Sequence, residues 1–371
     1  MESSSSAAPP PRSRSEPLKA AVATPLGEVG LVDENSQARL RALSVTTVEE
    51  LLGLIAADPD QVAEFVPELN LPKVQANAQG AARAPVLAEM ERYVEPDYAM
   101  GAEAPEGVEV EERASVERVE SWLQAAEAEP AREEDQPPAA NLIDCFGPVR
   151  NQEDRGTCVA HATCAVLECQ ETRRLGNKPD LSEQFIYWNA KTNDGHPDRS
   201  GTWLKIAMPL TERDGACDES VWPYVGSDVA GNEGQGPPPQ DAQADAQKHL
   251  LRKPRELNGH DSGAIRAALD GGLPVAISVP VYNNWYSNPA AHLLGLIPMP
   301  LPNSVIKGGH AMCAMGYGWD NDFAGGGYLI LRNSWGSDWA PQSPVAPGYG
   351  AIPLLYIDEY GWEAWTTENG N

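Results

Sequence analysis

Apolar residues recur at helical spacing in a short stretch near the N-terminus. These positions are Val48, Leu51, Leu52, Ile55, Val62, Phe65 and Val66. The pair Thr46-Thr47 precedes the first group and is suited to cap a helix. Asp58-Pro59 ends that group, and its Asp can cap the second. The pattern predicts a small helical hairpin over residues 41–80.

The second half of the chain changes from helical to β-type periodicity. Helical patterns run over 158–175, 181–193 and 203–213. Strand patterns follow over 273–281, 310–317, 327–333 and 349–356, with a short helix at 262–269. A Gly- and Pro-rich stretch, 226–246, lies between them and predicts an exposed loop. We therefore expect an α+β fold over residues 140–371, with a helical lobe, a β-barrel-like lobe and a cleft between them.

Two stretches show little sustained periodicity. Residues 1–40 are rich in Ser, Pro and Ala and predict a disordered tail. Residues 81–139 predict an acidic linker or pro-segment, because residues 89–135 hold sixteen acidic and four basic side chains. One short helix, 116–128, is expected within this linker.

The net charge of −27 bears on the partners that the protein can bind. A strongly acidic chain is repelled by nucleic acid and by anionic membranes, so we expect neither as a partner. The N-terminus lacks the pattern of a secretory signal, and we find no apolar run long enough to span a membrane.

Cys158 is the first candidate for chemistry. It lies at the predicted start of a helix that Thr157 can cap, directly after a polar loop. A helix N-terminus favours an anion, so this thiol is expected to ionise more readily than a free cysteine and to act as a nucleophile. The amide of Gln152, six residues upstream, and the Cys158 N–H can together bind a developing oxyanion if the loop folds back.

The segment from Gln152 to Cys158 resembles the active-site segment of papain-like cysteine peptidases. Further segments fit the same family in chain order, and these are Leu181-Ser182-Glu183-Gln184, Gly308-Gly309-His310, Leu331-Arg332-Asn333-Ser334-Trp335 and Gly348-Tyr349-Gly350. The resemblance covers roughly residues 141–365. It implies a two-lobe fold and a thiol endopeptidase that uses an acyl-enzyme and a peptide or protein substrate, and that needs no cofactor and no metal.

The resemblance also implies a role for each matching residue. Cys158 is then the nucleophile, His310 the general base and acid, Asn333 the residue that orients His310, and Gln152 the oxyanion donor. The substrate-binding positions it implies are Ser200, Gly201, Gly309 and Trp335. His161 is a rival base, one helical turn after Cys158, but it lies along the helix rather than across the cleft.

The sequence departs from the family beside the nucleophile. Arg155 stands where secreted members carry a pairing cysteine, Val159 replaces a Trp and His161 replaces an aromatic residue. With no signal sequence either, we expect a cytoplasmic, disulfide-free enzyme resembling an intracellular, bacterial-type variant. Two other functions remain open: acyl transfer or ligation on the same residues, and a catalytically silent protein-binding module.

The N-terminal region suggests regulation. We expect it to act as an inhibitory pro-segment, removed by cleavage near Glu129 to Asp135, or to dock a partner protein through the hairpin. In the more specific form of the first alternative, part of the acidic linker lies across the active-site cleft and inhibits the enzyme. The cluster Asp320-Asn321-Asp322 lies between two predicted strands, so we interpret it as a hairpin turn rather than a metal site.

Overall fold

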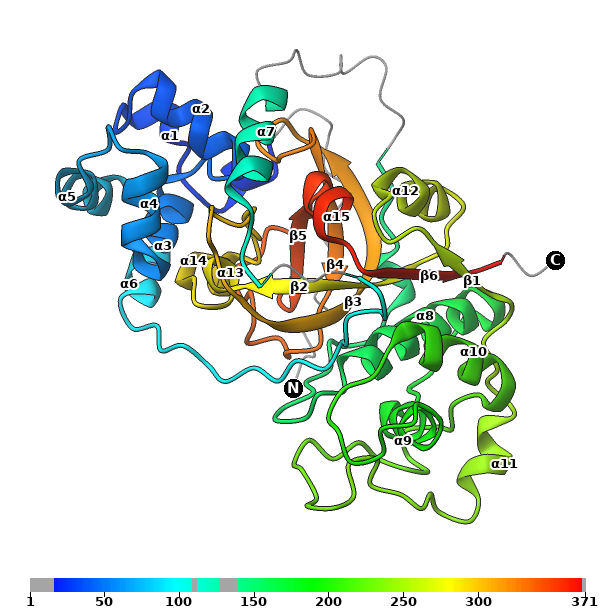
Figure 1. Cartoon of the computed structure of the whole chain (residues 1–371). Coiled ribbons are helices and arrows are strands. Elements are labelled where there is room, and N and C mark those ends of the chain that lie inside the picture. Colours follow the sequence, from blue (N-terminus) through cyan, green and yellow to red (C-terminus); the bar gives the residue numbers. More distant parts are fainter. Residues whose placement is uncertain (1–16, 109–111, 127–138, 369–371) are drawn as a thin grey trace, which may run out of the picture.

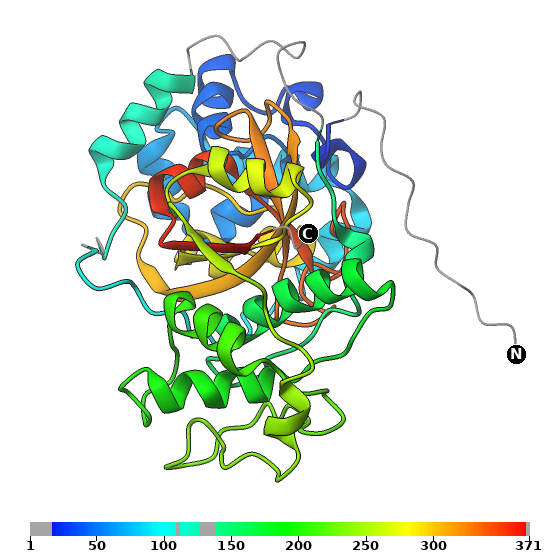
Figure 2. The same cartoon turned by 90° about the vertical axis from the view of Figure 1, so that its right-hand side faces the viewer.

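The helical lobe is built around one long central helix. The computed structural model describes residues 17–108, 112–126 and 139–368, and Figures 1 and 2 show this lobe in green below the sheet. Its helices are α8 (Cys158–Leu175), α9 (Glu183–Asn193), α10 (Leu204–Asp214) and α11 (Ala242–Ala246). Helix α8 packs against α9, α10 and the sheet, so its N-terminus lies at the junction of the two lobes.

The second lobe contains a six-stranded antiparallel sheet with the strand order β1-β6-β2-β3-β4-β5. The strands are β1 (Pro254–Leu257), β2 (Val275–Tyr282), β3 (Ile306–Trp319), β4 (Gly327–Arg332), β5 (Tyr349–Pro353) and β6 (Glu363–Thr367). Short helices complete this lobe: η3 (Ile143–Cys145), α12 (Ser262–Asp270), α13 (Asn283–Tyr286), α14 (Pro289–Leu294) and α15 (Leu354–Tyr360). The α+β two-lobe prediction is confirmed.

Alternation along the central strands divides the core into two layers. On β3, Ala311 and Cys313 belong to the cluster around α8, whereas Met312 and Ala314 belong to the cluster on the opposite face. Successive side chains of a strand point to opposite faces, so both faces of β3 are buried. His310 lies on this strand, directly opposite Val279 of β2, and is therefore held by a rigid element.

The N-terminal region forms a helical layer on the face of the sheet away from α8 (Figures 1 and 2). Its elements are η1 (Lys19–Ala21), α1 (Leu26–Val29), α2 (Glu34–Ala42), α3 (Val48–Ala57), α4 (Pro59–Phe65), α5 (Leu71–Ala81), α6 (Ala84–Met90) and α7 (Val116–Ala126). The predicted caps are present, with a complete capping box between Thr47 and Glu50 and an Asp58 cap on α4. The layer is joined to the β lobe by Met299 N–H donating to Leu43 O at 3.0 Å.

The prediction of a disordered tail over 1–40 is wrong for its described part. Residues 17–40 contain η1, α1 and most of α2, because Leu18, Leu26 and Leu40 are spaced to enter the core although polar and small residues surround them. Residues 1–16 lie outside the described part. The predicted 81–139 linker is likewise partly packed, since it contains α6 and α7.

Other local predictions need correction. The strand predicted over 349–356 ends at Pro353, and α15 begins at the next residue, Leu354. Strands β1 and β6 were not predicted. Thr157 precedes α8 but its hydroxyl bonds Tyr224 Oη at 2.7 Å instead of capping the helix. Asp320-Asn321-Asp322 forms the predicted turn between β3 and β4.

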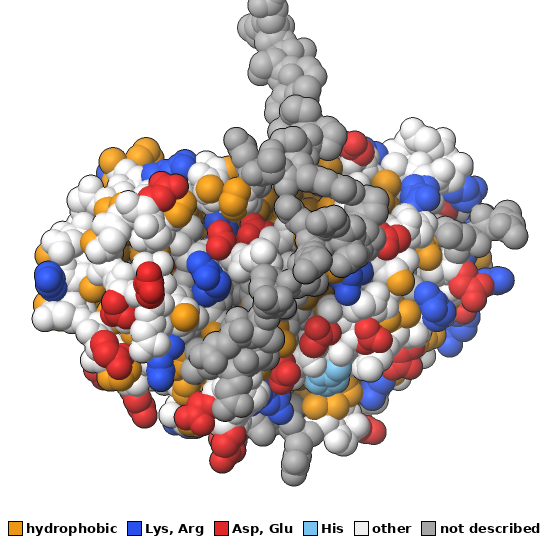
Figure 3. All heavy atoms as spheres, turned by 90° about the horizontal axis from the view of Figure 1, so that it is seen from above, with side chains coloured by type: hydrophobic (Ala, Val, Ile, Leu, Met, Phe, Trp, Pro, Cys, Tyr) orange, Lys and Arg blue, Asp and Glu red, His pale blue; other side chains and the backbone are white. Residues whose placement is uncertain are grey.

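Charge is distributed without a dominant basic area on the face shown in Figure 3. Lys and Arg side chains there, some of them side by side toward the right-hand edge, are mixed with Asp and Glu side chains. None of the helices in the described ranges combines the length and apolar character that crossing a bilayer requires.

Candidate active site

The four predicted catalytic side chains come from both lobes and meet at the N-terminus of α8. Cys158 is the first residue of α8, His310 lies on β3, and Asn333 follows β4 directly. His310 Nε2 and Asn333 Oδ1 are 2.7 Å apart. The N–H of Ala311, next to His310 on β3, hydrogen-bonds to the Cys158 sulfur. The structure thus brings the nucleophile and the His–Asn pair together across the junction.

Gln152 is held by hydrogen bonds to both its backbone and its side-chain amide. Ser334 Oγ donates to Gln152 Oε1 at 2.6 Å, and Ser334 O accepts from the Gln152 N–H at 2.8 Å. With its oxygen fixed by Ser334, the amide donates from Nε2 to Arg155 O in the active-site loop at 2.8 Å and to Ala99 O at 3.0 Å. Sequence analysis missed this role of Ser334, which lies between Asn333 and Trp335 within the matched motif.

Trp335 covers the His–Asn pair as expected. Its ring stacks on His310 with centroids 4.3 Å apart and is only 3% exposed. On its other side it stacks on Tyr98, again at 4.3 Å. Trp335 is therefore enclosed between the catalytic imidazole and a residue of the N-terminal region.

Residues 95–104, here called the cleft strap, lie across the catalytic residues. The strap belongs to the extended chain that leaves α6 and runs toward the helical lobe in Figure 1. The Ala99 carbonyl accepts from Gln152 Nε2 at 3.0 Å and from Trp335 Nε1 at 3.2 Å. The Gly101 N–H points at Cys158 Sγ, 3.3 Å away. The strap thus occupies the position that a substrate backbone needs.

Backbone pairing fixes the strap to both lobes. Ala102 N–H donates to Gly309 O at 3.0 Å on the β lobe, and Thr202 N–H donates to Gly101 O at 2.9 Å on the helical lobe. Glu103 N–H returns a bond to Thr202 O at 3.0 Å, which completes a parallel bridge. Of the predicted positions, Gly309 makes one of these bonds through its carbonyl, whereas on the helical lobe Thr202 makes them in place of the adjoining Gly201.

The predicted glycines and Ser200 border the strap rather than binding it through side chains. A Cβ on Gly309 would lie 2.1 Å from Ala102 O, and one on Gly201, whose φ is +88°, would lie 2.8 Å from Gly101 O. These glycines allow a peptide backbone to approach closely. Ser200 is exposed, and its hydroxyl lies against Gly156 in the active-site loop.

Burial keeps the catalytic pair neutral. Cys158 is fully buried, and desolvation raises the pKa of its thiol to about 11 despite several backbone N–H groups that favour the thiolate. Burial likewise lowers the pKa of His310 to about 4, although its bond to Asn333 opposes this shift. The expectation of a readily ionised, accessible thiol is therefore wrong for the strapped chain.

The rival base His161 is turned away from the catalytic pair. Its Nδ1 is 3.1 Å from Thr157 O, within its own helix, and its ring packs edge-on against Tyr224 at 4.9 Å. Burial lowers the pKa of His161 to about 3. His161 thus has the surroundings of a neutral core residue.

Arg155 anchors the active-site loop at the position of the missing cysteine. It is 1% exposed, and its guanidinium donates to Gln184 Oε1 at 2.7 Å and to Val225 O and Glu233 O, both at 2.9 Å. These bonds connect the loop before Cys158 to α9 and to the loop that follows Tyr224. A noncovalent clamp therefore holds this loop.

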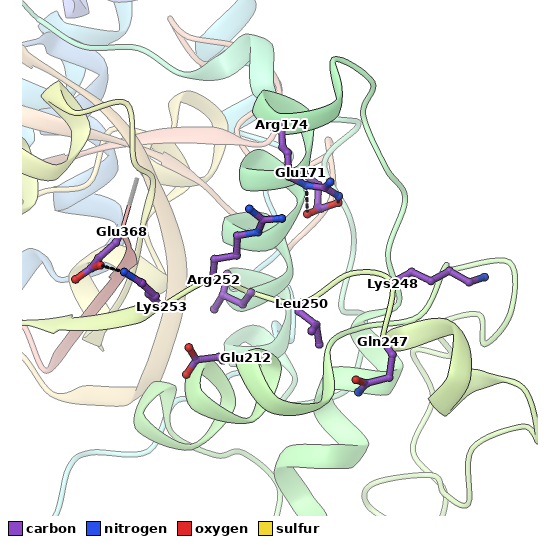
Figure 4. Close-up of a pocket in the computed structure, with 10 residues that line it drawn as sticks. Glu171, Arg174, Glu212, Gln247, Lys248, Leu250, Arg252, Lys253 and Glu368 are labelled. Atoms are coloured by element: carbon purple, nitrogen blue, oxygen red, sulfur yellow. Dashed lines mark hydrogen bonds and ion pairs between the residues drawn. The ribbon is translucent and has the colours of Figure 1, made fainter. Parts of the chain in front are cut away.

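A surface pocket of about 660 Å³ lies away from this site, along the C-terminal half of α8 (Figure 4). Four of its charged side chains form ion pairs, Glu171 with Arg174 and Lys253 with Glu368, as the dashed lines show. It contains no residue of the catalytic set. We assign it no part in the chemistry.

A buried cysteine at a helix N-terminus, facing a His–Asn pair on a second, β-rich lobe, defines a cysteine peptidase of the papain type. The chain belongs to this family, since the model of the papain family cysteine proteases matches residues 140–345.

Curated relatives each match a little over half of the chain. An uncharacterised peptidase C1-like protein of Acanthamoeba polyphaga mimivirus is 27% identical over 216 residues, which cover 56% of this chain and 64% of that protein. Cathepsin J of Mus musculus is 28% identical over 200 residues, covering 52% of this chain and 54% of the cathepsin. The chain therefore spans between half and two thirds of these relatives.

A solved structure shares the fold. The crystal structure of xylellain, a cysteine protease from Xylella fastidiosa, superposes with a TM-score of 0.57 at 22% identity. The match covers 75% of this chain and all of xylellain.

Proposed function

We propose that the protein is a thiol-dependent endopeptidase whose cleft strap inhibits it in the intact chain. The observation that carries this proposal is the strap itself, an extended peptide backbone bound beside Cys158 with its Ala99 carbonyl on the Gln152 amide. A cleft that binds peptide backbone through Thr202 and Gly309 is suited to peptide or protein substrates.

The proposed reaction begins when the strap leaves and a substrate takes its place. Cys158 transfers its proton to His310 and attacks the scissile carbonyl, and the carbonyl oxygen takes the negative charge. Gln152 Nε2 and the Cys158 N–H stabilise this oxyanion. His310 then protonates the leaving amine, and Asn333 keeps its ring oriented. Water activated by His310 hydrolyses the resulting thioester and restores the thiol.

The strap fits the role of an inhibitor because it presents an unreactive group to the nucleophile. The atom directed at Cys158 Sγ is the Gly101 nitrogen, which carries a hydrogen, and not an electrophilic carbonyl carbon. The strap therefore blocks the site without offering a bond to cut. Its contact at the sulfur is a backbone contact, whereas its acidic side chain Glu103 forms an ion pair with Arg199 of the helical lobe at 2.7 Å. The cleavage expected near Glu129 to Asp135 lies outside the described residues.

The proposal is tested with a diverse peptide library and mass spectrometry of the products. We expect hydrolysis that Cys158→Ala abolishes, with little loss of stability because a small apolar residue suits this buried position. An added amine nucleophile distinguishes acyl transfer, which would give amide products in place of free carboxylates. If a thiol-directed peptide probe fails to label Cys158 even after the strap is displaced, a silent binding module replaces the peptidase.

We also propose that the enzyme works in a reducing compartment such as the cytoplasm. The six cysteines all lie in the described residues and are free thiols, and Arg155 replaces a disulfide with a clamp of hydrogen bonds. Cell fractionation with an antibody to the chain tests this placement. Recovery in a secreted fraction would contradict it.

A further inference from the structure

Cys145 differs from the other cysteines in exposure. It is half-buried in η3, whereas Cys158, Cys164, Cys169, Cys217 and Cys313 are all buried. In the strapped chain, solvent-borne oxidants therefore reach Cys145 more readily than the catalytic thiol. Because oxidation needs access as well as ionisation, we expect half-buried Cys145 to be oxidised before the buried cysteines in this state.

A second thiol lies beside it. Cys169 is on α8, against which η3 packs, and its thiol is hydrogen-bonded to the sulfur of Cys145. This bond lowers the pKa of Cys145 to about 7 and raises that of Cys169. Among the charged groups nearby, Arg173 and Lys178 favour the Cys145 thiolate and Asp144 opposes it. Lys178 is held close because its Nζ donates to Phe146 O at 2.7 Å.

We infer that Cys145 and Cys169 form a reversible disulfide when the chain meets a peroxide. The Cys145 thiolate attacks one oxygen of hydrogen peroxide, forms a sulfenic acid and releases hydroxide. The Cys169 sulfur then attacks the Cys145 sulfur, and the sulfenic oxygen leaves as water. In total, two thiols and one peroxide give one disulfide and two waters. A small thiol or dithiol reverses the step by exchange.

The positions of Cys145 and Cys169 in the chain mean that a disulfide between them would stabilise the catalytic loop. A link from 145 to 169 closes a loop that contains both Gln152 and Cys158. Closing a loop stabilises the native state against unfolding, chiefly by restricting the unfolded chain. The oxidised chain is therefore expected to hold its catalytic loop more firmly while Cys158 remains a thiol under the strap.

The test uses the intact, reduced chain treated with hydrogen peroxide and then blocked with N-ethylmaleimide. Digestion after glutamate cuts at Glu168 and Glu171, which separates Cys169 from Cys158 and Cys164. We expect the linked peptides of Cys145 and Cys169 to appear at least about tenfold faster than oxidation of Cys158, and to disappear with dithiothreitol. The midpoint of thermal unfolding should rise with the linkage.

Variants distinguish a specific disulfide between Cys145 and Cys169 from nonspecific oxidation of the cysteines. Cys169→Ala should leave the Cys145 sulfenic acid without a partner, so that dimedone traps it, whereas the buried control Cys217→Ala should still form the disulfide. Cys145→Ser should abolish both products. Absence of the linked peptides in the peroxide-treated chain, or oxidation of Cys158 before Cys145, would overturn the inference. Neither readout depends on peptidase activity.

Discussion

The catalytic thiol shows how burial outweighs a helix N-terminus. The end of a helix favours an anion by about 0.3–1 kcal/mol. Raising the thiol pKa from 9.0 to about 11 corresponds to roughly 3 kcal/mol against the thiolate. Burial of Cys158 therefore outweighs the helix N-terminus in setting the charge of the thiol.

This balance predicts how the thiol reacts with pH. In the intact chain, alkylation of Cys158 by iodoacetamide should be slow at pH 7 and rise as the pH approaches 11, because only the thiolate reacts. Displacing the strap restores solvent and should shift the profile to lower pH. Peptide mapping of the alkylated cysteines at each pH measures this. Equal rates at pH 7 with and without the strap would contradict the shift.

The two histidines near the nucleophile should differ sharply. In a chain whose strap is displaced, His310→Ala should lower kcat on the order of 10³-fold, because the proton carrier is lost. His161→Ala should lower it less than about tenfold, since that ring bonds Thr157 O and Tyr224 lies beside it. Rates with one peptide substrate measure both. The opposite ranking would reassign the base.

Most of the catalytic residues could be predicted from the sequence, because each of them lies in a short sequence motif. The Gln152, Cys158, His310 and Asn333 set was predicted in chain order, and the structure brings these residues together. Ser334 and Thr202 were not predicted, since they act through backbone atoms or on another side chain. The suppressed ionisation of Cys158 was not predictable either, because it depends on a segment far away in sequence.

The position of the cleft strap depends on one close backbone contact. A Cβ on Gly101 would lie 1.8 Å from Gly156 O, a backbone atom that cannot move aside cheaply. Gly101→Ala should therefore displace the strap and raise peptidase activity of the full chain at least about tenfold, which corresponds to 1.4 kcal/mol. Initial rates at matched protein concentration measure this.

Gly147→Ala is the matched control for this substitution. A Cβ there meets nothing within 4 Å, so its activity should equal that of the original chain. If Gly101→Ala folds with an unchanged thermal midpoint and gains no activity, the strap is not the inhibitor.

Helices and strands were predicted correctly where the periodic pattern extends over many residues, and were missed where it covers only a few. Helix α8 was predicted over the range that the structure gives, Cys158–Leu175. Strands β1 and β6 have 4 and 5 residues, too few for a pattern to stand out. They form because each pairs with a neighbour distant in sequence, and β6 pairs with both β1 and β2.

At the scale of the molecule, the N-terminal layer and the β lobe share one core. Leu40, Leu51 and Leu54 lie in the same cluster as Ile277 and Tyr317 of the sheet. A chain cut before the catalytic region would expose this surface to water. Point substitutions in the intact chain are therefore the better way to study inhibition, and we expect the whole protein to unfold in one transition.

A buried ion pair within the layer tests this coupling. Lys19 and Glu50 are 2.7 Å apart and both buried. Glu50→Gln keeps an acceptor for the Thr47 cap but leaves Lys19 without its counter-charge, so it should destabilise the protein by about 3–5 kcal/mol. Unfolding in urea, monitored separately on the layer and on the β lobe, measures it.

The outcome separates coupling from local effects. We expect the N-terminal layer and the β lobe to unfold at the same urea concentration. The control substitution Glu28→Gln, at an exposed position in α1, should leave the unfolding of both regions unchanged. Restoring stability with Lys19→Met in the Glu50→Gln background would identify the uncompensated charge as the cause. Separate transitions would show that the layer folds independently.

The strap is covalently part of the chain that it covers, and this has a kinetic consequence. A tethered competitor has an effective concentration fixed by its own connections, so diluting the protein does not release it. Suppose that the strap is displaced in a fraction f of the molecules. The apparent Kd of every substrate is then the intrinsic Kd divided by f, while the turnover rate of a site that holds substrate is unchanged. The intact enzyme should therefore behave as one with a high KM and an ordinary kcat, at any protein concentration. Tight-binding or abundant substrates would be processed before any part of the chain is removed.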